Sequence, residues 1–431
     1  MAHVVILGAG MSGIPSCFEI RAKLGDNVDI TVISDKSQFY FIPATPLIAV
    51  GLRKVEDISI EIEPVLKAKN AKLIISAVEK LYPEKNLVIC KNGEKIKYDY
   101  LVIATGYKFD YESVEGLSNY SETIGTVAEV EKMRQKIPEF LENSNHIVIG
   151  ATQGSACFGP AYEYAMLVDY DLRRKKVREN VSITFVTPEP YLGHFGIGGI
   201  GDINGMLEKY LLSRDVKWIA NAKIDKFTED KVYVTEYDAD GVNKQQHILD
   251  SNFKMFMPPC RGIDVFKDIE DLVDSSGFII VDDFQHNPKY KNIFAVGVCV
   301  SVLGTEKTPV SMEPPRTDYM IETMIKTAAE NIRAMINGEE LSRSEKLSTI
   351  WLADFGDDGM VFIALPQNPP RDVSWAAEGK WVHFAKIAFE KYFMRNLRRG
   401  TSEPIFEKYI LKMASIDNIE DEKISRLEDC A

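Results

Sequence analysis

The residues best suited to chemistry lie at positions 150–163, which read GATQGSACFGPAYE. This segment follows an apolar run and leads into a stretch with helical spacing, which is where a βαβ unit carries its phosphate-binding turn. Such a turn ordinarily has three closely spaced glycines. Here only Gly150 and Gly154 are present, and Cys157 lies just inside the turn. The combination favours sulfur chemistry at a modified nucleotide turn.

Cys157 is the strongest catalytic candidate in the chain. A thiolate is the reactive form of cysteine, and the pKa of a thiol falls near the N-terminus of a helix. The competing interpretation is a buried thiol that only fills space. Cys260 and Cys299 each follow a predicted strand end, so either could serve as a substitute thiol. The cysteines and histidines show no zinc-ligand spacing, and no metal site is predicted.

Composition argues against several classes of function. The 431 residues are enough for two or three domains, and 45% hydrophobic with 27% charged residues is typical of a soluble or peripheral protein. A net charge of −13 argues against a general nucleic-acid binder. The N-terminal apolar run leads directly into a glycine turn, so we expect no signal peptide. No apolar run reaches the roughly 18 residues of a spanning helix.

The N-terminal segment predicts a dinucleotide-binding unit. Its elements follow one another as a strand at 3–7, a GxGxxG turn at 8–13, a helix at 14–24 and a strand at 29–33. Glycines are needed in this turn because it is tight and because the pyrophosphate approaches the backbone. The expected cofactor contacts are these glycines and the polar pair after the second strand: Gly8, Gly10, Gly13, Ser34 and Asp35.

A second mark of a flavin-binding fold lies at 98–106, which reads YDYLVIATG and predicts a strand ending in a turn at Thr105 and Gly106. With the first turn, it indicates an α/β flavoprotein with two dinucleotide-binding domains. Aromatic residues and prolines at 37–66, Pro43 among them, predict an ordered loop over a flat ring. Further strands are predicted at 73–78, 86–90, 182–186, 216–220, 231–234, 253–257, 278–281 and 292–297, and helices at 129–143 and 320–335.

The chain is predicted to form three domains. They are a discontinuous flavin-binding domain at 1–115 and 280–340, a second Rossmann-like domain at 116–279, and a C-terminal membrane-docking region at 341–431. In the last region, residues 381–399 predict a helix with aromatic residues and five basic residues against one acid. Such a helix can lie in a membrane interface, and the alternative is a helix packed on the protein's own core. A second short amphipathic helix is predicted at 403–413.

The motifs occur in the order GxGxxG, FxxxP, YDYLVIATG, SACFGPAYEYAM, EPYLGHFGIGGIGD and FEKYF…SEP. In this order, and over nearly the whole chain, the sequence resembles the bacterial and archaeal sulfide:quinone oxidoreductases. The resemblance implies a peripheral, monotopic protein of the cell membrane with two Rossmann-like domains and FAD. It also implies that sulfide, or another small sulfur donor, reduces the FAD and that a membrane quinone reoxidises it. Relatives of this kind often assemble, so a homo-oligomer is expected.

The resemblance also assigns residues to roles. Cys157 matches a redox cysteine, and His194 matches a histidine near the sulfide channel that could accept a proton. The matches at the quinone site are aromatic or apolar: Phe389, Phe406 and Leu352. The further matches at the flavin are Pro43, Val78, Gly297 and Arg316, the last of which stands where the family often has a lysine near the pyrimidine carbonyl.

Two cysteines of the family are replaced in this chain. Gly125 and Trp351 stand where the family has thiols, and Glu129 stands where it has a histidine. The resemblance therefore implies non-covalent FAD, because the thiol of the usual thioether is absent. A single thiol at Cys157 can carry a persulfide but cannot pass it to a second cysteine. The sulfur then needs an outside acceptor or a substitute thiol.

Several other activities stay open. A related flavoprotein could deliver sulfide electrons to a cytochrome, oxidise another thiol or persulfide, or act as a non-enzymatic flavin-binding scaffold. An NAD(P)H:quinone reductase is disfavoured because Ala156, Cys157 and Phe158 crowd the second nucleotide turn. The strand end at 186–190 also offers no arginine for a 2′-phosphate.

Overall fold

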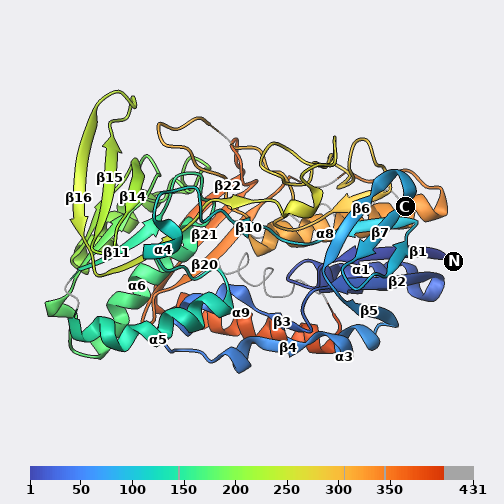
Figure 1. Cartoon of the computed structure of the whole chain (residues 1–431), viewed down its shortest axis with the longest axis horizontal. Coiled ribbons are helices and arrows are strands. Elements are labelled where there is room, and N and C mark those ends of the chain that lie inside the picture. The colour runs from blue at the N-terminus through green and yellow to red at the C-terminus, as the bar shows by residue number, and fades with distance from the viewer. Residues whose placement is uncertain (144–145, 305, 344–345, 402–431) are drawn as a thin grey trace.

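Two parallel β-sheets with flanking helices organise the structure (Figure 1). The computed structural model describes residues 1–143, 146–304, 306–343 and 346–401. The two sheets lie toward opposite ends of the long axis, and the C-terminal helix α9 (Lys380–Arg399) runs along one side. The predicted α/β class with two Rossmann-like units is confirmed.

The first sheet carries the N-terminal glycine turn. Its strands are all parallel and lie in the order β19-β9-β1-β2-β5. Their bounds are β1 (Ala2–Leu7), β2 (Val28–Ser34), β5 (Ala71–Ile75), β9 (Tyr100–Ile103) and β19 (Ile293–Ala295). Helices α1 (Gly13–Leu24) and α8 (Asp318–Asn337) lie side by side. Because β1, β9 and β19 are neighbours in the sheet, the turns that follow them meet at one edge.

The second sheet carries Cys157. Its strands are also all parallel, in the order β13-β12-β11-β17. Their bounds are β11 (His146–Ala151), β12 (Ser182–Val186), β13 (Val216–Ile219) and β17 (Phe253–Met257). The associated helices are α5 (Val127–Asn143), α6 (Phe158–Arg174) and α7 (Ile203–Ser213). β17 lies directly beside β11, so the chain after β17 emerges next to the Cys157 turn.

Smaller antiparallel units complete the architecture. Three of them have three strands each, namely β6 (Val78–Tyr82) with β7 (Leu87–Cys90) and β8 (Lys95–Lys97), β14 (Ala222–Phe227) with β15 (Lys231–Tyr237) and β16 (Lys244–Asp250), and β20 (Thr349–Asp354) with β21 (Gly359–Leu365) and β22 (Val373–Glu378). Two-stranded pairs join β3 (Gln38–Tyr40) to β4 (Ser59–Glu61) and β10 (Lys108–Phe109) to β18 (Cys260–Arg261). A short helix, α4 (Leu117–Tyr120), precedes α5.

Three predictions of local structure differ from the structure. Residues 37–66 are not a loop, because β3, α2 (Thr45–Ala49), β4 and α3 (Ile62–Lys67) lie within them. Their aromatic rings belong to the hydrophobic core and do not form a loop over a flat ring. Phe39 and Phe41 are buried against Phe393 of α9. Residues 278–281 form only isolated bridges through Ile279 and not a strand, and the predicted strand at 73–78 ends at Ile75.

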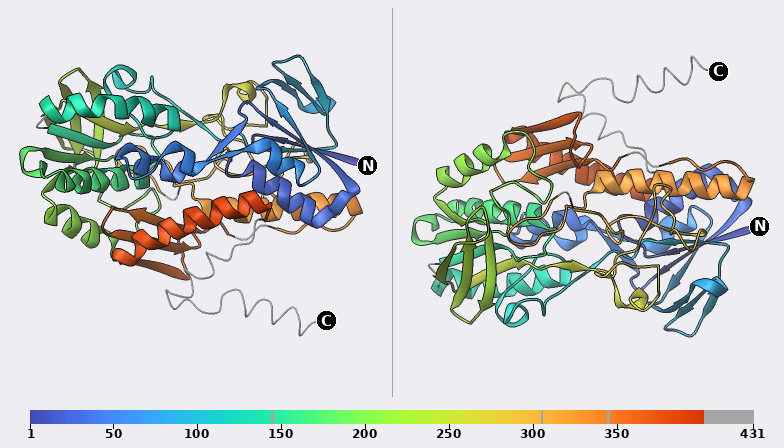
Figure 2. Two further views of the ribbon diagram at one scale, coloured as in Figure 1. Left: turned by 90° about the horizontal axis from the view of Figure 1, so that it is seen from below. Right: turned by 90° about the horizontal axis from the view of Figure 1, so that it is seen from above.

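Helix α9 packs on the body of the protein along one face. Figure 2 (left) shows it running beside the N-terminal elements, where Arg53 pairs with Glu390 at 3.0 Å. Farther along, the buried Lys386 donates to both carboxylate oxygens of Glu163 in α6. No helix in the described part of the chain is long and apolar enough to cross a membrane. The predicted helix at 403–413 lies outside the described residues.

Candidate active site

Cys157 occupies the N-cap position of α6, after the turn that follows β11. The turn is fixed by backbone contacts to a distant segment, since Gly154 N–H donates to Ser311 O at 2.7 Å and Glu313 N–H donates to Ser155 O at 3.0 Å. Gly154 has a φ of +75°, which a residue with a side chain adopts only under strain. The turn is therefore a fixed support for the Cys157 thiol.

The backbone amides of this turn are engaged within the protein. Thr152 N–H donates to Met257 O at 3.1 Å, Ser155 N–H donates to Thr152 O at 3.2 Å, and Cys157 N–H donates to Ser155 Oγ at 3.1 Å. Together with Gly154, they occupy the donors that a dinucleotide phosphate would need at this position. Four backbone amides of the second nucleotide turn therefore donate within the protein and would have to change partners to bind a phosphate.

A second thiol lies against Cys157. The Cys260 Sγ is 3.7 Å from the Cys157 Sγ, and Cys260 itself is buried. The strand topology explains the contact, because Ala151 at the end of β11 pairs with Met257 at the end of β17. Pro258 and Pro259 then carry the chain into β18, which begins at Cys260. Sequence reasoning named Cys260 and Cys299 as possible substitute thiols without choosing between them, and the structure places Cys260 against Cys157.

The two thiols have opposite pKa shifts. The hydrogen bond from Cys260 lowers the pKa of Cys157 and outweighs the effect of burial, with the Tyr107 hydroxyl and the Arg316 charge acting in the same direction. Burial raises the pKa of Cys260 well above its usual range, and the hydrogen bond to Cys157 adds to the increase. Cys157 is therefore the thiolate of the pair and Cys260 the protonated donor.

Two further residues complete the surroundings of the thiols. The Tyr107 hydroxyl lies 3.5 Å from the Cys157 Sγ and donates to it when the sulfur is a thiolate. The Arg316 side chain is only 2% exposed, and its guanidinium lies 4.1 Å from the ring centroid of Phe278. Sequence reasoning missed Tyr107, although it comes directly after the Thr105–Gly106 turn, a position that could have drawn attention to it.

The glycine turn of the first sheet is a close-packed cradle. A Cβ at Gly8 would lie 2.4 Å from Ala104 O, and one at Gly13 would lie 1.9 Å from Gly8 O. A Cβ at Gly10 would meet no described atom within 4 Å, so open space adjoins this position. Across the edge, a Cβ at Gly297 would lie 2.4 Å from Ser12 Oγ. The structure thus brings the predicted glycines of β1 and β19 together around one space.

Unsatisfied polar groups mark the same region. Within the described residues, the three guanidinium nitrogens of Arg316 and the hydroxyls of Thr105 and Thr317 are buried without a hydrogen-bond partner. Buried polar groups normally have partners, so such a set calls for a ligand rich in acceptors. FAD fits, because its pyrophosphate suits the glycine turn and its ring carbonyls suit Arg316. We found no group of three or more metal-ligating side chains among the described residues.

The remaining predicted cofactor residues differ in exposure. Ser34 ends β2, is buried, and accepts a hydrogen bond from Lys36 N–H at 3.2 Å, whereas Asp35 is exposed. Pro43 is half-buried in the turn before α2, and Val78 begins β6. Their contacts with FAD stay predictions.

The two positions that lack the family's cysteines are filled by aromatic packing. A Cβ at Gly125 would lie 1.9 Å from the ring of Phe109, which leaves no room for a thiol. The indole of Trp351 stacks on Phe362 at 4.8 Å and covers Gly159 in the first turn of α6. Both sites near Cys157 therefore hold rings where a sulfur would otherwise lie.

Cys299 lies in a different environment from Cys260. It is buried, and its thiol donates to the carbonyls of Ile103 and Val296 at 3.3 Å each. Burial raises its pKa to about 11. A thiol that is protonated and already bonded to two backbone carbonyls is poorly suited to redox chemistry. The contacts favour Cys260 over Cys299 as the substitute thiol.

His194 lies beside a cavity of about 770 Å³ that is also lined by Tyr191 and Glu306. Its Nδ1 accepts a hydrogen bond from Gly196 N–H at 3.1 Å, and its Nε2 lies 2.6 Å from Glu306 Oε1. Because Nδ1 accepts a hydrogen bond, the proton of the neutral imidazole lies on Nε2. The Nδ1 atom, which could accept a further proton, is already hydrogen-bonded to Gly196 N–H. His194 as the proton acceptor for sulfide stays a prediction.

The predicted quinone residues are partly brought together. Leu352 on β20 and Phe389 on α9 belong to one hydrophobic cluster between the β20–β22 sheet and the helix. The Phe389 ring also contacts Phe41 at 5.9 Å between centroids. Phe406 lies outside the described residues. Quinone binding at Leu352 and Phe389 stays a prediction.

The structure combines a flavin cradle at one sheet edge with the Cys157–Cys260 thiol pair, and the Arg316 charge lowers the pKa of Cys157. These features define a flavoprotein oxidoreductase with two Rossmann-like domains. The sequence model of the family described as pyridine nucleotide-disulphide oxidoreductase matches residues 2–317. The sulfide-quinone reductase of Aquifex aeolicus is 40% identical, over 95% of this chain and 94% of its own length.

Solved structures give the same relationship. The crystal structure of the sulfide:quinone oxidoreductase from Aquifex aeolicus matches with a TM-score of 0.91 at 40% identity, over 96% of this chain and 95% of that chain. The mitochondrial sulfide:quinone oxidoreductase of Schizosaccharomyces pombe is 26% identical over 79% of this chain and 75% of its own length. The chain therefore belongs to the sulfide:quinone oxidoreductase family, and it is an FAD-dependent oxidoreductase.

Proposed function

We propose that this protein oxidises sulfide and reduces a membrane quinone. The observation that carries the proposal is the Cys157 thiol, held at the N-cap of α6 with a lowered pKa and with Cys260 and Tyr107 as neighbours. FAD bound in the glycine cradle would supply two-electron transfer between the sulfur donor and the quinone. Cys157 supplies the thiolate for the sulfur chemistry, and the Tyr107 hydroxyl and the Arg316 charge favour that form.

The second nucleotide turn supports sulfide over a nicotinamide donor. Its amides donate within the protein, as described above, so a second dinucleotide would have to break those bonds. An acidic residue after the second strand often binds a ribose, but Glu189 is fully buried. It accepts hydrogen bonds from Tyr162 Oη at 2.8 Å and Phe195 N–H at 2.8 Å. These contacts favour a sulfur donor.

Spectra of the bound flavin test the function. Sulfide added to the purified holoenzyme without oxygen should bleach the flavin, and a short-chain quinone should restore its colour. Bleaching by NADH but not by sulfide would overturn the proposal. Recovery with a cytochrome but not with quinone would favour the sulfide dehydrogenase-like alternative.

Cys157→Ser tests the thiol within the same assay. The variant should lose sulfide-driven bleaching while retaining FAD. Cys90→Ser is a matched control, because Cys90 is a buried thiol on β7 in a separate antiparallel sheet. If Cys157→Ser bleaches as the control does, the Cys157 thiol serves only in packing.

Membrane attachment through the C-terminal region is also part of the proposal. Helix α9 exposes Trp381 and Phe384, the latter at 66%, and family membership agrees with a site at the cell membrane. The three-domain division and a homo-oligomeric state stay proposals as well. The separate parallel sheets and the β20–β22 sheet support the division.

A further inference from the structure

We propose that Cys157 and Cys260 form the redox-active dithiol–disulfide pair of this protein, with Cys260 as the resolving thiol. Their sulfur atoms lie 3.7 Å apart, which is van der Waals contact. A disulfide bond is about 2.05 Å long, so closing the bond requires only a small approach of the two side chains. The inference rests on the proposed function in one respect, namely that FAD takes the electrons.

The fold holds both thiols in place from the backbone. Cys157 follows β11 and Cys260 follows β17, two parallel strands that are hydrogen-bonded neighbours. Cys260 is held on its other side too, because β18 pairs with β10 so that Cys260 lies opposite Phe109. The contact is therefore a product of strand register and not of one flexible side chain.

The pair is chemically unequal, as thiol–disulfide exchange requires. Cys157 is partly exposed and favoured as a thiolate, while Cys260 is buried and stays protonated. A thiolate of low pKa is also the better leaving group when a disulfide is attacked. Incoming sulfur is therefore expected to attack Cys260 and to expel Cys157 as the thiolate.

Packing explains why the second thiol comes from β18. The ring of Phe109 fills the space beside Gly125, and Trp351 covers Gly159 at the start of α6. Those two approaches to Cys157 are closed by rings. On the β18 side, the neighbour of Cys157 is the Cys260 sulfur. Phe109 lies opposite Cys260 in the β10–β18 strand pair. The Phe109 ring thus fills the space of a thiol at position 125 and also lies beside the Cys260 thiol.

The steps of the exchange balance. In the reduced pair, which consists of the Cys157 thiolate and the Cys260 thiol, the single S–H bond breaks and an S–S bond forms, and two electrons and that one proton would pass to bound FAD. A hydrosulfide ion then attacks the Cys260 sulfur; a new S–S bond forms, and the old bond breaks with its electron pair on Cys157. A second hydrosulfide ion takes the outer sulfur as HSS⁻, and the persulfide proton remains on Cys260.

Peptide mapping under non-reducing conditions tests the pair directly in the wild-type holoenzyme. After oxidation by quinone, the peptides containing Cys157 and Cys260 should be joined by a disulfide that a reductant releases. After treatment with sulfide in the absence of oxidant, the peptides that contain Cys157 and Cys260 should no longer be joined. Each thiol should then be either alkylated or present as a persulfide, which adds the mass of one sulfur atom to the peptide. Free alkylation of both thiols in the oxidised enzyme, or a bond from Cys157 to Cys299, would overturn the inference.

Cys260→Ser provides a second measurement. With sulfide and quinone, its turnover should fall by about 100-fold or more, since a resolving group in a fixed position is lost. Cys90→Ser, in which a buried thiol is lost from another sheet, should turn over like the wild type. Wild-type turnover in Cys260→Ser would show that Cys260 is not the partner of Cys157.

The two proposals fail separately. If sulfide does not bleach the wild-type flavin, the proposed function fails, but a Cys157–Cys260 disulfide in the oxidised protein would still support the pair. If sulfide bleaches the flavin and no such disulfide forms, the proposed function stands and only the Cys157–Cys260 pair is ruled out.

Discussion

At the scale of single residues, the charge on the Cys157 sulfur is set by three neighbours. Cys260 and Tyr107 can donate hydrogen bonds to it, and Arg316 contributes positive charge. Each favours the thiolate, and their combined effect exceeds the cost of burial. The reactivity of the thiol therefore depends on residues from three separate segments of the chain.

Removing the Cys260 thiol should raise the pKa of Cys157, because the largest favourable contact with the thiolate is lost. In the reduced wild type, the pH midpoint for alkylation of Cys157 should lie below the ordinary 9.0, and in Cys260→Ala it should move upward. Mass spectrometry of the Cys157 peptide over a pH series measures both midpoints. Equal midpoints in the two proteins would show that Cys260 does not act on Cys157.

Glu189 is a buried carboxyl group that sequence reasoning did not single out for a role. It accepts hydrogen bonds from Thr187 Oγ1 at 2.7 Å and from Tyr162 and Phe195, and so joins the end of β12 to the glycine-rich loop that follows it. Burial raises its pKa from 4.5 to about 7. Glu163, which pairs with Lys386, is raised to about 7 for the same reason.

Because the folded pKa of Glu189 exceeds its unfolded value, its contribution to stability is fully present below 4.5 and is lost as the pH rises through about 7. The loss is on the order of 3 kcal/mol. Glu189→Gln mimics the protonated form, so its free energy of unfolding should fall less over this range. Chemical denaturation of both proteins at the two ends of the range measures the difference. An equal pH dependence would contradict the assignment, and Glu163, unchanged in both, sets the common background.

The site was predictable from sequence to the extent that local motifs define it. The N-terminal glycine turn, the Thr105–Gly106 turn and the position of Cys157 are all read from residues near one another in the chain. The approach of Cys260 depends on the pairing of β11 with β17, which sequence spacing does not encode. Arg316 was assigned by resemblance, and the structure adds that its donors are unsatisfied among the described residues.

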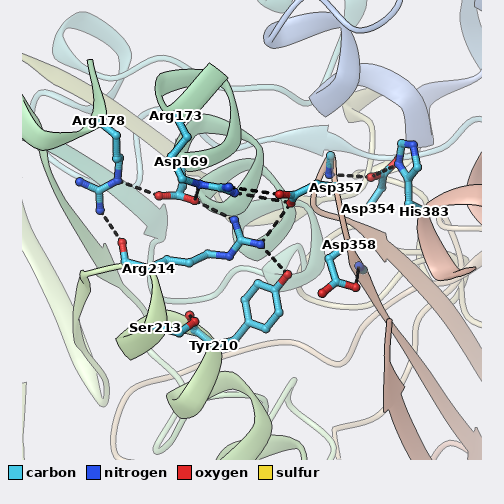
Figure 3. Close-up of polar contacts among 12 residues, drawn as sticks. Asp169, Arg173, Arg178, Tyr210, Ser213, Arg214, Asp354, Asp357, Asp358 and His383 are labelled. Atoms are coloured by element: carbon cyan, nitrogen blue, oxygen red, sulfur yellow. Dashed lines mark hydrogen bonds and ion pairs between the residues drawn. The ribbon is translucent and has the colours of Figure 1, made fainter. Parts of the chain in front are cut away.

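At the scale of elements, an ion network joins the second Rossmann-like unit to the C-terminal sheet (Figure 3). Asp169 of α6 is 1% exposed and accepts from Arg178 at 2.7 Å and from Arg214 at 2.8 Å. Arg173 bridges Asp169 and Asp357, the latter in the turn between β20 and β21. The network fixes the sheet that carries Leu352 and Trp351 against α6.

Asp169→Asn should destabilise the protein by about 3–5 kcal/mol, because it removes the buried carboxylate that Arg178 shares with Arg173 and Arg214 and leaves the last two with Asp357 alone. Asp357→Asn is the matched control, since it removes a carboxylate from Arg173 and Arg214 at a site that is 39% exposed. Its cost should stay below about 1 kcal/mol. Equilibrium denaturation compares the two variants, and equal losses would show that burial does not set the strength of this network.

The elements themselves were unequally predictable. Strands at 182–186 and 253–257 match β12 and β17 at both ends, because each is a short, largely apolar run in a parallel sheet, β12 inside it and β17 at its edge. The β20–β22 sheet was not predicted, although its middle strand, Gly359–Leu365, is largely buried. The aromatic segment at 37–66 was misread because its rings face α9, a helix more than 300 residues later in the chain.

At the scale of the whole molecule, α9 presents a solvent face whose character changes along its length. Its exposed positions are Lys380, Trp381 and Phe384 near the start, followed by Ala388, Lys391, Arg395, Arg398 and Arg399. With a rise of about 1.5 Å per residue, this face extends for about 25 Å. Two exposed rings near the start, with Lys380 beside them and four exposed cations in the second half, suit a helix that lies against an anionic lipid surface.

Phe384→Glu should weaken binding to vesicles that contain anionic lipid by about 10-fold or more, since burial of one phenylalanine is worth about 1.5–3 kcal/mol. Ile248→Glu on β16 is the control, because it replaces a similarly exposed apolar residue away from α9. Vesicle co-sedimentation measures both. Equal binding by the two variants would place the membrane contact elsewhere.

The two sulfur atoms belong to residues that are 103 positions apart in the chain. A bond between them would close a loop of that length in the unfolded protein, and the lost conformational freedom is worth about 4–5 kcal/mol in the chain-entropy account. The oxidised protein would then withstand heat better than the reduced protein, with nearly the same native contacts. Its melting temperature would report the oxidation state of its own thiols.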